Sequence, residues 1–214
     1  MSLTLHCFGE SGNAYKAALT LELAGLDWTA AFVDFFNGAA RTDSYKEINE
    51  MGEVPVLVDT TTGLNLSQSG VIQDWVVRQT GRLGGQTDED RQEVLRWLLW
   101  DNHKMSSQAG ICRFLMNFLP EEKRPQPVIE WYQNRLKAAY TVLNDRLSDR
   151  DWVAIDELSI ADIACAGYLY YPEPFGFDRT DWPNIDAWLT RLSETPGWKH
   201  PYDLMPGRPS DHGL

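Results

Sequence analysis

Pro55 stands inside an apolar, β-branched run, and this residue restricts the fold more than any other feature of the sequence. The run Val54–Asp59 has the composition of a buried strand. Proline has no amide hydrogen to donate to a strand ladder, so it is tolerated only at an edge or at the first position of a strand. A cis Val54–Pro55 bond would fix a turn there, and the preceding backbone would then face a ligand instead of a neighbouring strand. We therefore predict a cis bond at the entrance to this strand.

Strand and helix patterns alternate over the first 82 residues. β-branched and aromatic runs predict strands, and apolar residues at helical spacing predict helices. The order is strand, helix, strand, then a polar helix, then a hairpin and a last helix; the segments are 3–9, 14–25, 28–36, 41–50, 54–59 with 64–66, and 69–81. This order, βαβ-α-ββα, predicts a small mixed sheet flanked by helices in a domain over residues 1–82.

The pattern beyond the glycine pair Gly84-Gly85 is helical throughout. Ser159 and Asp162 form a pattern like a capping box, which marks a helix start. The other predicted helices run from about 94 to 118, 126 to 147 and 182 to 194, followed by an irregular tail from 200. The sequence therefore predicts an all-helical second domain over residues 88–214.

The composition is that of a soluble globular chain, with 43% hydrophobic residues, 23% charged residues and a net charge of -12. An acidic surface repels phosphate backbones, so we expect no nucleic-acid partner. We recognise no signal peptide and no apolar run of about 18 residues, so we expect no membrane segment. Cys7, Cys112 and Cys165 are too widely spaced for a metal or disulfide framework and fit a reducing compartment. The expected location is the cytoplasm, and no metal is expected.

Four short motifs and the order of the elements resemble the cytosolic glutathione transferase superfamily, with features of its serine-type bacterial, zeta-like and beta-like members. The motifs are Ser11-Gly12-Asn13-Ala14-Tyr15-Lys16, Gly52-Glu53-Val54-Pro55-Val56-Leu57, Gln68-Ser69-Gly70-Val71-Ile72 and Ser159-Ile160-Ala161-Asp162. The resemblance covers nearly the whole chain. It implies a thioredoxin-like N-terminal domain, an all-helical C-terminal domain, glutathione as co-substrate and a homodimer.

Ser11 is placed by the resemblance at the catalytic serine of these relatives. Glutathione reacts as its thiolate, whereas a free thiol has a pKa of about 8.5. A hydroxyl that donates to sulfur, with a helix N-terminus behind it, stabilises the charged form. Gly12 belongs to the same turn, and Asn13 is a second candidate donor. Taken without the other motifs, these three residues are more typical of a polar turn that precedes a helix.

The other glutathione contacts follow from the remaining motifs. Gln68 and Ser69 precede a helix, so the Ser69 hydroxyl and free backbone N–H groups suit the γ-glutamyl carboxylate; a plain N-cap is the competing interpretation. The backbone of Val54, held by Pro55, would pair with the cysteinyl part of glutathione in the manner of an added strand. No particular side chain is needed for that contact.

Glu53 departs from the family pattern, because many relatives have a basic residue or glutamine near this position. Its carboxylate would repel the glycine carboxylate of glutathione. Arg41 is the alternative partner from the first domain, and His103-Lys104 resembles a His-Lys pair that lines the site in beta-class relatives. A lone histidine on a helix is more often only packed or solvated.

The leading hypothesis is a glutathione transferase that activates the thiol for attack on a small hydrophobic electrophile. A glutathione-dependent isomerase or peroxidase on the same scaffold is an alternative. A binding or scaffold protein without efficient catalysis is a third reading, which Glu53 favours. Dithiol exchange of the thioredoxin type is excluded, because Ser11 to Ala14 stand where its two cysteines would be.

Overall fold

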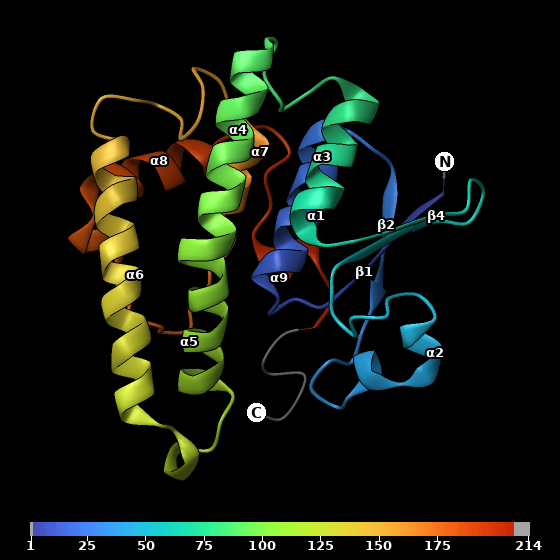
Figure 1. Ribbon diagram of the computed structural model, residues 1–214, viewed down its shortest axis with the longest axis horizontal. Coiled ribbons are helices and arrows are strands. Elements are labelled where there is room, and N and C mark those ends of the chain that lie inside the picture. The colour runs from blue at the N-terminus through green and yellow to red at the C-terminus, as the bar shows by residue number, and fades with distance from the viewer. Residues whose placement is uncertain (1, 208–214) are drawn as a thin grey trace. The chain divides into compact units, whose positions relative to one another are not determined.

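The computed structural model describes residues 2–207. The described chain forms two compact units (Figure 1): the first contains residues 2–82 together with residues 196–207, and the second spans Leu83–Thr195. The expectation of a helical domain over 88–214 therefore differs from the structure at the C-terminal segment, which belongs with the first unit.

The first unit is built on a mixed sheet of four strands, β1 (Leu3–Cys7), β2 (Trp28–Phe32), β3 (Val56–Asp59) and β4 (Leu64–Ser67), in the order β2-β1-β3-β4. β1 runs parallel to β2 and antiparallel to β3, and β3 is antiparallel to β4. Alternate residues of β1 are fully buried, as expected for a strand with one face on the core. The predicted order βαβ followed by ββα is confirmed.

The helices of the first unit are α1 (Gly12–Ala24), α2 (Asp43–Lys46), α3 (Ser69–Thr80) and α9 (Pro201–Leu204). Figure 1 shows α1 and α3 beside one another next to the sheet, and a buried hydrogen bond from Gln73 Nε2 to Thr20 Oγ1, at 3.1 Å, joins them. The polar helix expected over 41–50 is shorter: a 3₁₀ turn, Ala39–Arg41, precedes the single turn of α2.

The C-terminal segment contacts the rest of the first unit through α1 and the turn that precedes it. Tyr15 Oη donates to the Lys199 carbonyl at 2.9 Å, and Lys199 Nζ pairs with Glu22 at 2.5 Å. The Gly9 amide donates to the Pro206 carbonyl at 2.7 Å. A Cβ on Gly9 would lie 1.8 Å from the carbonyl oxygen of Gly207, so this approach requires glycine.

The second unit contains α4 (Asp88–Asp101), α5 (Ser107–Asn117), α6 (Gln126–Arg146), α7 (Ile160–Ala166) and α8 (Pro183–Ser193). The long helix predicted from 94 to 118 is present as α4 and α5, which a π-helical turn, Asn102–Ser106, joins into one column beside α6 (Figure 1). π-helical turns inside α-helices are frequent at functional sites. Among residues 2–207, no helix is long and apolar enough to span a bilayer.

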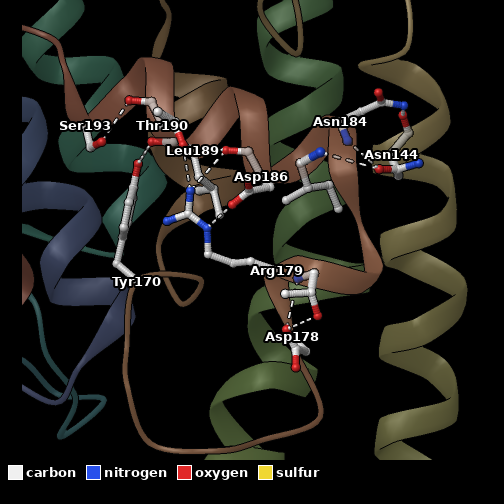
Figure 2. A network of polar contacts seen from close by, with 11 residues as sticks. Asn144, Tyr170, Asp178, Arg179, Asn184, Asp186, Leu189, Thr190 and Ser193 are labelled. Atoms are coloured by element: carbon white, nitrogen blue, oxygen red, sulfur yellow. Dashed lines mark hydrogen bonds and ion pairs between the residues drawn. The ribbon is translucent and has the colours of Figure 1, made fainter.

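A polar network holds α8 to the segment before it and to α6 (Figure 2). Arg179 Nε pairs with Asp186 Oδ1 at 2.5 Å and its Nη2 donates to Thr190 Oγ1 at 2.9 Å, while Asn144 Oδ1 accepts from the Asn184 amide at 3.0 Å. Asn184 carries one of the free amides of the first turn of α8, so Asn144 acts as a cap supplied by a neighbouring helix. The network fixes the position at which α8 begins, and its role is structural.

Candidate functional site

The strand register brings three of the predicted motifs to one end of the sheet. His6 near the end of β1 pairs with Val56 at the start of β3, and Val56 pairs with Ser67 at the end of β4. The chain that leaves β1, the chain that enters β3 and the chain that leaves β4 therefore emerge at the same end of the sheet. These are the segments that carry Ser11, Val54-Pro55 and Gln68-Ser69.

Ser11 caps the first turn of α1. The residue is buried, with 8% of its surface exposed, and its Oγ accepts a hydrogen bond from the Ala14 amide at 3.1 Å. Within the described residues the hydroxyl hydrogen has no acceptor, so it stays available to a further partner. The capping role and a donor role are therefore compatible in one hydroxyl group. Asn13, in the same turn, has a buried Oδ1 with no hydrogen-bond partner among residues 2–207.

The Val54–Pro55 peptide bond is cis, as predicted. The peptide unit before it is fixed by two buried side chains that the sequence did not single out: Tyr45 Oη and Asn49 Nδ2 both donate to the Glu53 carbonyl, at 3.0 and 2.9 Å. The carbonyl and the N–H of a trans peptide point in opposite directions. The Val54 N–H is therefore turned away from Tyr45 and Asn49, and no described residue accepts a hydrogen bond from it.

Gln68 and Ser69 form the entrance to α3. Gln68 has φ +71°, a left-handed conformation that is uncommon outside glycine, and its carbonyl accepts from the amides of Val71 and Ile72 at 3.0 Å. The amides of Ser69 and Gly70 have no described partner, so two N–H groups at the start of a twelve-residue helix are free. Gln68 gives no side-chain cap; its Nε2 donates instead to Glu53 Oε2 at 3.3 Å.

The predicted cationic residues are exposed and lie in both units. Arg41 ends the 3₁₀ turn of the first unit. The backbone of this turn passes close to Gly52, because a Cβ on Gly52 would lie 2.9 Å from the Ala40 carbonyl oxygen. His103 and Lys104 lie in the π-helical turn of the second unit. Buried Gln108 donates from Nε2 to the Lys104 carbonyl at 2.8 Å and to the His103 carbonyl at 3.3 Å. Gln108, a polar residue four positions after Lys104, is the sequence signal that could have indicated this contact.

The three cysteines lie within the described residues, are buried, and form no disulfide with one another. Burial raises the pKa of the Cys7 thiol to about 12 and that of Cys112 to about 11. At neutral pH these groups are almost fully protonated, and a protonated thiol is a poor nucleophile. Cys7 is fully buried at the end of β1. Cys7 therefore does not fit a redox-active cysteine of the glutaredoxin type.

Comparison with known proteins shows the family of the chain. Residues 1–78 match the family model of the glutathione S-transferase N-terminal domain, and residues 108–196 match that of the C-terminal domain. Glutathione S-transferase GstB of Escherichia coli K12 is 30% identical, over 91% of this chain and 94% of that protein. The disulfide-bond oxidoreductase YfcG of the same organism is 28% identical, over 88% of this chain and 89% of that protein.

One similar solved structure was determined with its ligand bound. A glutathione transferase from Burkholderia graminis, determined with two glutathione molecules bound per subunit, superposes with a TM-score of 0.83 at 25% identity, covering 92% of this chain and 85% of that one. Both halves of the chain match their family models in the expected order, and a relative at 30% identity is matched over nearly its full length. The chain therefore belongs to the glutathione S-transferase family.

Proposed function

We propose that this protein is a glutathione transferase that binds glutathione at the sheet end where Ser11, Val54 and Ser69 emerge. It activates the thiol there for attack on a small hydrophobic electrophile. The observation that carries the proposal is the buried Ser11 hydroxyl at the N-terminus of α1, which accepts one hydrogen bond and has its hydrogen left to donate. This hydrogen and the positive end of the helix both stabilise a thiolate over a thiol.

The peptide part of glutathione has a backbone partner in Val54. Because Tyr45 and Asn49 hold the Glu53 carbonyl, the Val54 N–H is presented to the cysteinyl carbonyl as in an added antiparallel strand. Ser69 supplies its hydroxyl and its free amide to the γ-glutamyl carboxylate, at the positive end of α3. Gly12 and Pro55 shape the two turns and need contribute no side-chain contact.

The glycine carboxylate requires a cation, and Arg41, His103 and Lys104 are the proposed sources. Arg41 belongs to the first unit, and the other two are proposed on the resemblance to beta-class relatives. Replacing each with glutamine is expected to weaken binding of glutathione without weakening binding of its glycine amide. Equal losses for both ligands would remove that residue from the proposal.

The test of the proposed function is an ultraviolet difference titration of glutathione at neutral pH. A free thiol with a pKa of about 8.5 is only a few per cent ionised at pH 7, so a thiolate absorption band that grows on binding reports activation directly. We expect this band to appear and saturate with bound glutathione. Binding without the band would contradict thiol activation, and no binding would contradict the proposed function altogether.

Glutathione-dependent disulfide reduction is a second candidate, because the matched relative YfcG is a disulfide-bond oxidoreductase. Two glutathione molecules would supply the electrons, forming glutathione disulfide and two thiols from the disulfide substrate. The buried cysteines of this chain would take no part. Reduction of a small disulfide at a rate unchanged in a variant without Cys7 would support this activity, and no rate above the background of glutathione alone would exclude it.

We further propose a homodimer in the cytoplasm, as the resemblance implies. Light scattering at micromolar concentration is expected to give twice the chain mass of 24.4 kDa. A single chain mass at that concentration would contradict the dimer.

A further inference from the structure

Glu53 lies against the entrance of α3. Its Oε2 accepts from Gln68 Nε2 at 3.3 Å, and Gln68 directly precedes Ser69, the proposed partner of the γ-glutamyl carboxylate. Met51 Sδ lies 3.2 Å from the same Nε2. The carboxylate of Glu53 is thus held beside the γ-glutamyl end of the proposed site, fifteen residues away along the chain but next to Gln68 in the fold.

The charge of Glu53 is not neutralised by the protein. Among the described residues, no lysine, arginine or histidine nitrogen lies within 4.0 Å of this carboxylate, and Oε1 accepts no hydrogen bond. The Gln68 amide uses its N–H group toward Glu53 and Met51, which leaves its own carbonyl, Oε1, as a further acceptor. Glu53 and Gln68 therefore offer acceptor oxygens with a net negative charge, and the Gln68 Nε2 group is already used as a donor. Such a set of acceptors suits an ammonium group.

We propose that Glu53, together with the Gln68 side-chain carbonyl, recognises the α-ammonium of the γ-glutamyl residue. This inference rests on the proposed binding of glutathione at this end of the sheet. An α-amino acid group carries both charges on one carbon, and the site matches both. The free amides and the hydroxyl at Ser69 receive the carboxylate, and Glu53 receives the ammonium. Glu53 thus determines specificity at the γ-glutamyl end. The sequence suggested that Glu53 repels the glycine carboxylate, whereas here its carboxylate attracts the ammonium at the opposite end of glutathione.

The test measures dissociation constants by calorimetry for three ligands: glutathione, N-glutaryl-cysteinyl-glycine, which lacks only the ammonium, and glutathione amidated at glycine. The proteins are the wild type, Glu53→Gln and the control Glu50→Gln, which removes the same charge from an exposed residue nearby. Because the Glu53 side chain is exposed and its carbonyl is held independently, Glu53→Gln is expected to fold normally.

The wild type is expected to bind glutathione about three- to tenfold more tightly than the glutaryl analogue, a range typical of a charge-assisted contact at an exposed site. Glu53→Gln is expected to abolish this preference, whereas Glu50→Gln keeps it. A preference unchanged in Glu53→Gln would overturn the inference and leave the proposed function intact. So would tighter binding of glutathione by Glu53→Gln that disappears with the glycine amide, since Glu53 would then act on the glycine end. Failure of all three ligands to bind any protein would overturn both.

Discussion

Ser11→Ala is expected to lower kcat/KM for glutathione conjugation at least tenfold, which corresponds to about 1.4 kcal/mol of transition-state stabilisation. The Ser11 hydroxyl is the donor at the N-terminus of α1 whose hydrogen is uncommitted among the described residues. Its loss leaves the thiolate with the helix terminus and the second candidate donor, Asn13. The thiolate absorption band of bound glutathione at neutral pH is expected to shrink in the variant and to return only at higher pH, because the thiol pKa rises.

The control must separate the thiol from the helix cap, since Ser11→Ala also removes the cap of α1 at a cost of about 1 kcal/mol. Thr87→Ala removes a cap of the same kind from α4, where Thr87 Oγ1 accepts from the Asp90 amide at 3.0 Å. We expect it to lower stability by a similar amount and to leave kcat/KM unchanged. Ser11→Thr keeps a hydroxyl and is expected to keep most of the thiolate band. Wild-type turnover and an undiminished band in Ser11→Ala would remove Ser11 from catalysis.

The segments of the site could be predicted from sequence wherever a residue type conflicts with its surroundings. Pro55 conflicts with a strand interior, so a cis bond at the strand entrance follows, and the structure has it. Ser11 precedes a regular helical pattern, so its capping position follows as well. Such local conflicts are readable because the physical rule involves only neighbours in the chain.

The partners that fix the site could not be predicted in this way. Tyr45 and Asn49 act on a backbone carbonyl at Glu53, and a carbonyl gives no signal in a sequence. The contact between Glu53 and Gln68 joins two residues fifteen positions apart and exists only because the β3–β4 hairpin returns the chain to the same end of the sheet. The sequence shows that Glu53 departs from the family pattern. Which residue its side chain contacts depends on the register of β3 and β4.

The contacts of the C-terminal segment could not be predicted, for a related reason. Residues 200–214 show no helical periodicity, and continuity along the chain assigned them to the helices before them. The structure instead connects residues 196–207 to the start of the chain, through hydrogen bonds from the Gly9 amide to Pro206 and from the Tyr15 hydroxyl to Lys199. Contacts over almost two hundred positions leave no periodic pattern, so only the tertiary structure can show them.

Asp162→Ala is expected to destabilise the second unit by about 3–5 kcal/mol, several times the usual effect of losing a helix cap. The Asp162 side chain is fully buried. Its Oδ1 accepts from the Val153 amide at 2.7 Å and from Trp188 Nε1 at 3.0 Å, and its Oδ2 accepts from the amide and hydroxyl of Ser159 at 3.0 and 2.9 Å. The carboxylate thus joins the start of α7 to α8 and to the preceding loop, and alanine would leave these buried donors unsatisfied.

Asp90→Ala is the matched control for that change. Asp90 occupies the same third position of a capping box in α4, where its Oδ2 accepts from the amides of Thr87 and Gln86 at 3.0 Å at an exposed site. Water can replace it there, so we expect a loss of only about 1 kcal/mol. Urea unfolding followed by circular dichroism compares the two midpoints. If Asp162→Ala and Asp90→Ala shift the midpoint equally, the buried contacts to Trp188 and Val153 add nothing, and Asp162 is an ordinary helix cap. If Asp162→Ala shifts it several times further, this one carboxylate holds together three segments of the helical unit.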